Sequence, residues 1–329
     1  VTSLKNNLFG SFSATLKPFK WITFSSTNTL TLTNGNANDY LDSRTYTGNH
    51  SSNEMSNGVL TVDDERSWTF LTSNILRLQH SFGEHNLNGL VGQEWYERHS
   101  RTSRIKMYDQ IIAGERNVGG FSKQGDKTNP GVIPTGTERE SGSFSVFSEV
   151  NYNYAGKYMA SASFRTDGST NFGKDNRYGT FYSFSGSWLV SREKFMKHLD
   201  VVSNLKLRMS YGTSGKEAGI DYLNYTLYST SNTTFDYYRY HPFYPSAYGA
   251  EINQLGNDQL SWETAYNLNF GVDLGLLNNR ISLSMDWYKR RNSDLIMSTT
   301  LPAANGVGQQ YRNVGEMENR GVELVLNTH

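Results

Sequence analysis

The hairpin between Leu260 and Met297 constrains the fold of this chain more than any other stretch. In its first arm, from Trp262 to Leu274, aromatic and aliphatic residues alternate with polar or small ones, and the second arm resumes this alternation at Ile281. A period of two is the period of a β-strand, and the two asparagines between the arms predict a short turn between antiparallel neighbours. The sequence therefore predicts a hairpin with one apolar and one polar surface.

The arms of this hairpin are unusually long. Each carries seven or more alternating positions, which exceeds the roughly 5–6 residues of a typical soluble strand. The length fits the roughly 9–11 residues that a tilted strand needs to cross a bilayer. Trp262, Tyr266 and Trp287 stand toward the ends of the arms, where a membrane interface favours aromatic side chains. We interpret the hairpin as part of a membrane β-barrel.

Composition supports strands rather than helices as the membrane-crossing elements. Only 36% of the 329 residues are hydrophobic, and no apolar run approaches the roughly 18 residues of a membrane helix, so any crossing must be made by closed strands. The formal net charge is zero, which argues against nucleic acid as a partner. The absence of cysteine removes disulfide and thiol chemistry and suits a periplasmic route.

The same alternation recurs along the chain and predicts about eleven strands of an all-β, antiparallel transmembrane β-barrel. Short connections are predicted at 17–20, 82–86, 154–157 and 275–280. Polar stretches predict long exposed loops at 34–65, 100–140 and 213–259, and a shorter loop at 166–177. Residues 191–200 are expected to form one or two helical turns capped by Ser191. Short periplasmic turns opposite long extracellular loops are typical of outer-membrane barrels.

No motif predicts catalysis, a cofactor or a metal site, and we expect no enzyme. The seven histidines show no metal-ligand spacing. Residues 212–216 have two residues between their glycines, where a phosphate-binding loop has four. Asp167, Ser169 and Asn171 follow the rhythm of a calcium loop, but Tyr178 stands where its glutamate ligand belongs. The acidic run 63–65 is interpreted as the solvated end of a loop.

Two groups of residues are candidates for contact with a ligand. The first is ionisable and falls on the predicted lumen-facing surface: Glu149, Lys206, Arg208, Glu263, Asp273, Asp286 and Glu323. A cargo path, solvation of the lumen and packing against a plug all account for these residues. Arg208 and Glu263 are candidates for an ion pair across neighbouring strands.

The second group is aromatic and lies in the predicted loop 213–259: Phe235, Tyr237, Tyr238, Tyr240, Phe243, Tyr244 and Tyr248. Aromatic rings stack on the apolar faces of sugars, and the tyrosine hydroxyl adds a hydrogen bond. Packing of the loop on itself and contact with a lid protein are the alternatives.

Six phrases resemble the SusC-like (SusC/RagA) branch of the TonB-dependent outer-membrane transporters, in the same order and with the same spacing. They are YNYAGKYMASASFRTDGSTNFG (152–173), SFSGSWLVSREKF (183–195), LKLRMSYGTSG (205–215), LSWETAYNLNFGVDLGLLNNR (260–280), DWYKRRNSDLI (286–296) and NVGEMENRGVEL (313–324). Together they span more than half of the chain.

The resemblance implies a barrel of about 22 strands around an N-terminal plug, a periplasmic TonB box, and a SusD-like lipoprotein over the outer mouth. It implies import driven through the TonB–ExbB–ExbD complex, with oligosaccharide as the usual cargo and peptide less often. Residues 1–329 are then an internal part of the barrel domain, and the plug, the TonB box and the closing strands are expected outside them. The alternatives are a passive porin-like or adhesin barrel in the outer membrane, and a soluble all-β binding protein.

Overall fold

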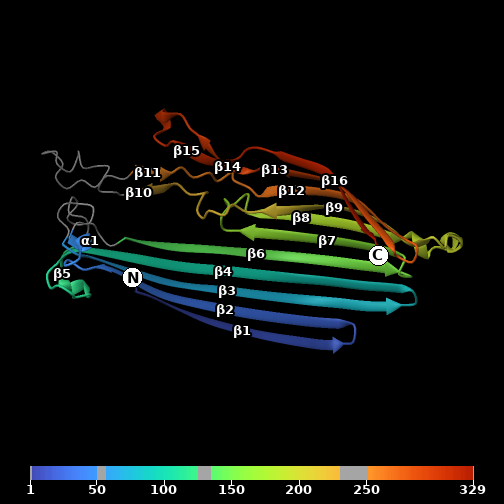
Figure 1. The fold of residues 1–329 in the computed structure, drawn as a ribbon, viewed down its shortest axis with the longest axis horizontal. Coiled ribbons are helices and arrows are strands. Elements are labelled where there is room, and N and C mark those ends of the chain that lie inside the picture. The colour runs from blue at the N-terminus through green and yellow to red at the C-terminus, as the bar shows by residue number, and fades with distance from the viewer. Residues whose placement is uncertain (1, 50–56, 125–134, 230–250, 329) are drawn as a thin grey trace.

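A computed structural model describes residues 2–49, 57–124, 135–229 and 251–328 (Figure 1). In these ranges one 12-stranded antiparallel sheet dominates, with β5 paired beside β4 and the other strands in the order of the sequence. Its long strands are β1 (Thr2–Phe19), β2 (Ile22–Leu41), β3 (Val59–Phe82), β4 (His85–Gln110), β6 (Thr135–Tyr154), β7 (Tyr158–Ser169), β8 (Tyr178–Leu189), β9 (Val202–Lys216), β12 (Glu263–Leu276), β13 (Ile281–Ser293) and β16 (Met317–Thr328).

The remaining elements are short and lie in the connections. Two of the connections contain two-stranded ladders, β10 with β11 and β14 with β15. No helix in the described ranges has the length and apolar character needed to span a bilayer. The short elements are α1 (Tyr46–Asn49), η1 (Val118–Gly120), β5 (Phe121–Gln124), η2 (Val190–Arg192), η3 (Lys194–His198), β10 (Leu227–Ser229), β11 (Glu251–Gln254), β14 (Ile296–Thr300), η4 (Ala303–Asn305) and β15 (Gln309–Asn313).

The predicted alternation becomes two distinct surfaces of the sheet. Across β9, β12, β13 and β16, the register aligns Leu207, Val272, Met285 and Leu324 in one row. Side chains of successive residues point to opposite sides of a strand, so the neighbouring row of polar residues faces the other way. We call these surfaces the apolar face and the polar face. Large hydrophobic side chains on the apolar face are exposed, for example Met209 at 54% and Leu324 at 61%.

Short and long connections lie at opposite ends of the strands, as predicted. The turns at 20–21, 83–84, 155–157 and 277–280, together with 190–201, define what we call the turn end. Leu277, Asn278 and Asn279 have positive φ, and asparagine adopts this left-handed conformation more readily than most residues. We call the opposite end, which carries the long connections, the loop end (Figure 1).

Aromatic rings line the turn end in an unbroken series. Phe82 lies 4.9 Å from His85, His85 4.7 Å from Tyr154, Tyr154 6.3 Å from Tyr158, and Tyr158 6.1 Å from Trp188, all between ring centroids. These contacts run from β3 to β8. Such a girdle is what a membrane interface favours.

The predicted loops at 34–65 and 100–140 are wrong in their extent. Strand β2 continues to Leu41 and β3 begins at Val59, while β4 continues to Gln110 and β6 begins at Thr135. Polar side chains pair across neighbouring strands in much of these extensions, so the apolar alternation used to predict strands is absent there. The acidic run 63–65, predicted as a loop end, lies within β3: Asp63 accepts two hydrogen bonds from Arg104, at 2.5 and 3.0 Å, and Glu65 accepts one from Lys5 at 3.1 Å.

Two further local predictions are wrong. Trp262 does not face outward with Tyr266, because it precedes β12 and packs against Phe172 and Phe181, with ring centroids 5.1 and 5.8 Å away. Its indole also donates to the carbonyl of Arg177 at 3.1 Å. The predicted cap by Ser191 is wrong as well: residues 190–192 and 194–198 form two 3₁₀ turns, in keeping with the predicted one or two helical turns, but no side chain caps either of them.

Buried apolar residues gather only at the loop end in the described ranges. One cluster contains Phe172, Ala218, Leu223 and Leu260. A second contains Leu60, Met107 and Phe121 near the tips of β3 and β4. The long middle part of the sheet carries neither cluster, which leaves both of its faces open.

Candidate functional site

The seven ionisable candidates share the polar face. Register aligns Arg208 with Gly271, Gly271 with Asp286, and Asp286 with Glu323, so these positions form one row across four strands. Lys206 lies opposite Asp273 in the adjoining row. Glu149 and Glu263 fall on the same face further toward the loop end. A cargo path along these residues stays a prediction.

Arg208 forms the centre of the strongest polar network on this face. Its Nε and Nη2 donate to the two carboxylate oxygens of Asp273 at 2.8 and 2.9 Å, and Nη2 also donates to Asp286 at 3.1 Å. Ser284 donates to Asp273 at 2.8 Å. Paired hydrogen bonds of this kind fix the guanidinium plane as well as its charge. The network therefore ties β9, β12 and β13 together on one face.

Gly271 makes this network possible. It stands between Arg208 and Asp286 in the register, and a Cβ placed there would lie 2.6 Å from both Arg208 Cζ and Asp286 Oδ1. The missing side chain lets the guanidinium reach across β12 to β13. Sequence inspection overlooked Gly271, although its place on the polar face between Asn269 and Asp273 was a usable signal.

The predicted pair of Arg208 with Glu263 is wrong. Glu263 lies at the loop end of β12, where Lys216 Nζ approaches it to 3.5 Å and the backbone N–H of Ile296 donates to it at 2.8 Å. The register aligns Glu263 with Lys216 and Arg208 with Gly271, about eight residues further along the strand. Strand register, which the alternation alone did not fix, determines both pairs.

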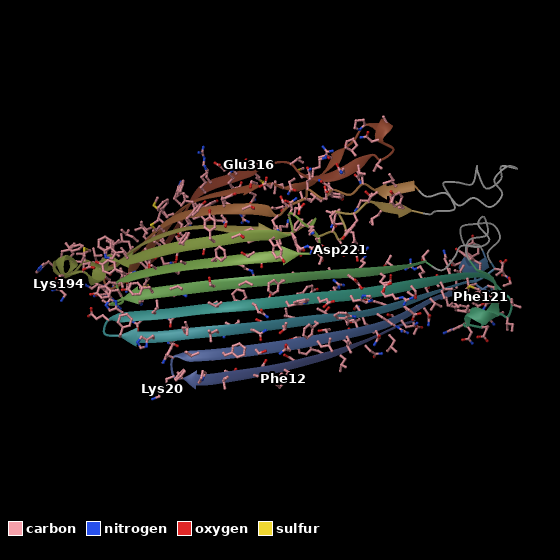
Figure 2. All side chains as sticks on the ribbon, turned by 180° about the vertical axis from the view of Figure 1, so that it is seen from behind. Phe12, Lys20, Phe121, Lys194, Asp221 and Glu316 are labelled. Carbon is pink, nitrogen blue, oxygen red and sulfur yellow. The ribbon has the colours of Figure 1, made fainter. Side chains whose placement is uncertain are left out.

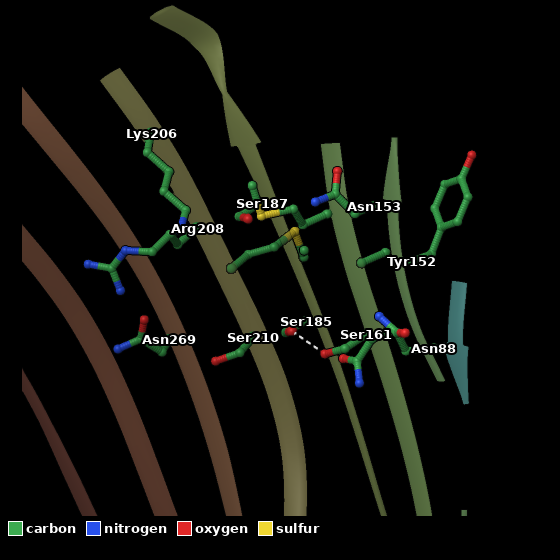
Figure 3. A pocket seen from close by; sticks show the side chains of 15 residues that line it. Asn88, Tyr152, Asn153, Ser161, Ser185, Ser187, Lys206, Arg208, Ser210 and Asn269 are labelled. Carbon is green, nitrogen blue, oxygen red and sulfur yellow. Dashed lines mark hydrogen bonds between the residues drawn. The ribbon is translucent and has the colours of Figure 1, made fainter. Parts of the chain in front are cut away.

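Uncharged hydrogen-bonding side chains form a second row beside the Arg208 network. The register runs across six strands through Asn88, Asn151, Ser161, Ser185, Ser210 and Asn269. The hydroxyl groups of Ser161 and Ser185 lie 2.6 Å apart (Figure 3). A depression of about 480 Å³ lies along this row. Its lining includes all six residues of the row, together with Lys206 and Arg208, and Figure 3 labels seven of these side chains: Asn88, Ser161, Ser185, Ser210, Asn269, Lys206 and Arg208.

This row offers donors and acceptors without net charge, beside a strongly paired cation. Asn151 also donates to Glu149 at 2.6 Å. Glu323, next to Asp286 on the outermost strand β16, forms no ion pair with any described residue. The polar face can therefore present neutral hydrogen-bonding groups to a ligand or to another protein segment.

The aromatic candidates Phe235, Tyr237, Tyr238, Tyr240, Phe243, Tyr244 and Tyr248 lie outside the described residues. The residues that follow the rhythm of a calcium loop bind protein groups instead. Asp167 accepts a hydrogen bond from Arg165 at 2.6 Å, and Ser169 accepts one from the N–H of Asn171 at 3.2 Å. In the described ranges, no group of three histidine, aspartate or glutamate side chains is placed to hold a metal ion.

An open antiparallel sheet with an apolar and a polar face, an aromatic girdle and short turns at one end defines a segment of an outer-membrane β-barrel wall. Residues 4–329 match the family model described as TonB dependent receptor-like, beta-barrel. The chain therefore belongs to the TonB-dependent receptor family and forms part of its outer-membrane barrel. The turn end is periplasmic and the loop end extracellular.

Individual relatives place the chain in the SusC-like branch. TonB-dependent receptor P3 of Formosa agariphila is 32% identical over 274 residues, which are 82% of this chain and 26% of that protein. TonB-dependent receptor SusC of Bacteroides thetaiotaomicron is 36% identical over 185 residues, which are 56% of this chain and 18% of SusC.

A solved structure is similar along nearly the whole chain. The structure of the RagAB peptide transporter has a TM-score of 0.80 and 28% identity, covering 98% of this chain and 34% of that one. The chain thus spans about a third or less of the length of these three proteins. The similarity confirms the predicted barrel segment of SusC/RagA type.

Proposed function

We propose that this chain forms part of the wall of an active importer that carries nutrients across the outer membrane, with oligosaccharides as the first candidate cargo. Membership of the TonB-dependent receptor family is the observation that carries the proposal. A polar face rich in asparagine and serine supports it, because amide and hydroxyl groups exchange hydrogen bonds readily with sugar hydroxyls. Similarity to SusC, at 36% identity, favours the same branch.

Peptides are the second candidate cargo. The observation that favours them is the similarity of this chain to the RagAB peptide transporter. Backbone amides of a peptide would also use the neutral row from Asn88 to Asn269. Lys206 and Glu323, which form no ion pair in the described ranges, are then available for charged side chains of such a cargo.

We further propose that residues 1–329 work within a longer protein that supplies a plug, a TonB box and the strands that close the barrel. The matched relatives are about three to four times longer than the parts they share with this chain. The partners would be the TonB–ExbB–ExbD complex on the periplasmic side and a SusD-like lipoprotein at the loop end. No catalytic residue or cofactor is assigned.

The test is uptake by cells that carry or lack the full-length protein. Labelled oligosaccharides and labelled peptides are supplied separately, each with and without an uncoupler that collapses the proton gradient. The proposal expects uptake of one class that needs both the protein and the gradient. Uptake that needs the protein but ignores the uncoupler would instead establish a passive pore.

The aromatic segment is tested in the same assay. Replacing Tyr237, Tyr238, Tyr240 and Tyr244 with alanine should lower uptake or lipoprotein binding if the rings contact cargo or the lid. Tyr228→Ala is the matched control, since Tyr228 is an exposed tyrosine of the loop end. Unchanged uptake and unchanged lipoprotein binding in the fourfold variant would rule out both roles.

A further inference from the structure

The connection between β8 and β9 differs from every other described connection at the turn end. It spans residues 190–201, contains η2 and η3, and we call it the basic connector. Its side chains include three large apolar groups that face solvent: Phe195 is 61% exposed, Leu199 51% and Val201 57%. A polar turn is sufficient to join two strands. Exposed apolar groups in such a connection therefore indicate a surface that binds a partner.

Hydrogen bonds hold the connector against the apolar face. Glu193 accepts from Tyr158 Oη at 2.7 Å, from Trp188 Nε1 at 3.3 Å and from Lys157 Nζ at 3.2 Å. Tyr158 and Trp188 are members of the turn-end aromatic girdle and stack 6.1 Å apart. Because their polar atoms point to Glu193, the connector is joined to the side of the wall that faces lipid.

The position of the connector matches the membrane interface. Figure 2 shows Lys194 at the extreme turn end, beyond the ends of the long strands. At its C-terminal side the carbonyl of Val201 accepts from the N–H of Leu277, which joins the connector to the neighbouring turn at 2.9 Å. The connector therefore lies next to the girdle, to which Glu193 is bonded, at the end of the sheet where the girdle marks the edge of the bilayer.

Three of the five formal charges on the connector are positive, those of Arg192, Lys194 and Lys197, and two are negative, those of Glu193 and Asp200. Lys194 and Lys197 are exposed, and neither forms an ion pair within the described part of the chain. Arg192 donates to the carbonyl of Gly156 at 3.2 Å, and the negative charge of Glu193 is balanced by Lys157. Exposed lysines beside exposed apolar groups are the combination that binds a phospholipid surface.

We propose that the basic connector binds the periplasmic phospholipid leaflet of the outer membrane. Phe195, Leu199 and Val201 insert at the boundary between headgroups and acyl chains, and Lys194 and Lys197 contact headgroup phosphates. Insertion buries the exposed apolar area, and long lysine side chains reach the phosphates while their stems stay in the apolar layer. The connector thereby fixes the depth of this side of the barrel wall.

The test uses a nitroxide spin label at a single cysteine in the full-length transporter, reconstituted in vesicles of phosphatidylethanolamine and phosphatidylglycerol. The chain contains no cysteine of its own, and any cysteine elsewhere in the protein is first replaced. Labels at Phe195→Cys and Leu199→Cys are compared with one at Glu84→Cys, in the polar turn between β3 and β4. Collision rates with oxygen, which enters lipid, and with a water-soluble nickel chelate are measured.

The proposal expects an oxygen-to-nickel collision ratio several-fold higher at 195 and 199 than at 84. Adding Lys194→Glu and Lys197→Glu should lower this ratio at 195 and leave it unchanged at 84. Equal ratios at 84, 195 and 199 would overturn the proposal, because the connector would then project into water. Low collision rates with both reagents would also overturn it, since a protein partner rather than lipid would cover the connector.

Discussion

The two halves of the sheet reach the loop end in different ways. In the N-terminal half, β2, β3, β4 and β6 contain 20 to 26 residues and continue as a regular ladder beyond the apolar zone. In the C-terminal half, β7, β8, β12, β13 and β16 contain 12 to 14 residues. There the connections fold over the strand ends around Phe172 and Leu260.

This difference separates two sources of stability outside the membrane. Apart from the small cluster of Leu60, Met107 and Phe121 at its tip, the N-terminal extension depends on backbone pairing and on many exposed polar contacts, each of them weak. The C-terminal loops depend on a small buried core, where each apolar side chain contributes more. Between the extension and the turns, both halves share the same requirement for an apolar face toward lipid.

The largest effect is expected in the C-terminal core. Phe172 is fully buried, so Phe172→Ala should destabilise the packed loops by about 3–5 kcal/mol. Phe172→Leu fills most of the same volume and should cost less than about 1.5 kcal/mol. Hydrogen exchange of residues 170–177 and 217–226 in the full-length protein measures both. Similar protection in wild type and Phe172→Ala would contradict a core-dependent loop end.

The shared membrane zone is tested by one substitution on each face. Ala162→Lys places a charge on the apolar face and should cost about 2–4 kcal/mol. Ser163→Lys, one residue away, places it opposite Glu149 on the polar face and should cost under about 0.5 kcal/mol. Urea unfolding in phospholipid vesicles measures the difference. Equal costs would show that both faces meet the same environment.

The polar network should be sensitive to a single methyl group. Gly271→Ala brings a Cβ within 2.6 Å of Arg208 and Asp286, displaces their hydrogen bond and should cost about 1–2 kcal/mol. Gly186→Ala is the control, because its nearest atom, Met209 Cγ, is 3.8 Å away. The same unfolding assay applies, and an equal loss in both variants would show that strand propensity, rather than the network, is responsible.

Acid should weaken the turn end through Glu193. Hydrogen bonds from Tyr158 and Lys157 lower the pKa of Glu193 below its ordinary value of 4.5. Because the pKa is lower in the folded state, the stabilisation from ionised Glu193 is complete above the ordinary, unfolded pKa. It is lost as the pH falls through the folded pKa. Wild type should therefore lose more stability than Glu193→Gln between neutral pH and acid. Parallel pH profiles would refute this role.

The smallest effect is expected in the N-terminal ladder. Asp63→Asn weakens the exposed pair with Arg104, so the amides around 61–65 and 102–106 should exchange faster while the unfolding midpoint stays constant. Asp39→Asn is the control, since Asp39 forms no ion pair in the described ranges. A clear shift of the midpoint in Asp63→Asn would show that the ladder depends on few strong contacts.

The turns and the two faces could be predicted from the sequence because membrane burial imposes strict alternation. The turn at 277–280 and the antiparallel pairing of its two arms followed from that pattern. The loop-end parts of β2, β3, β4 and β6 could not be predicted. Between the apolar zone and the small cluster at the tips, their side chains are polar on both faces, so the apolar signal is lost. The prediction for Trp262 is wrong for a related reason: the alternation begins before the point where β12 starts, and tertiary packing determines the direction of this side chain.

To predict which residues pair on the polar face, one needs the strand register as well as the face on which each residue lies. Arg208 and Glu263 both alternate correctly, yet their partners are set by positions along neighbouring strands. Gly271 has no side chain, so a search for candidate side chains does not single it out. Its lack of a Cβ nevertheless allows the Arg208 guanidinium to reach Asp286. The aromatic group from Phe235 to Tyr248 remains a prediction from composition.

The alternation of faces along β7 is the central claim, and one fluorescence measurement tests it most directly. A bimane label is attached to single cysteines at residues 160 to 165 of the full-length protein in vesicles whose acyl chains carry bromine. Quenching by bromine should be strong at 160, 162 and 164 and weak at 161, 163 and 165. Uniform quenching, or strong quenching at 161, 163 and 165, would contradict a wall with one face toward lipid.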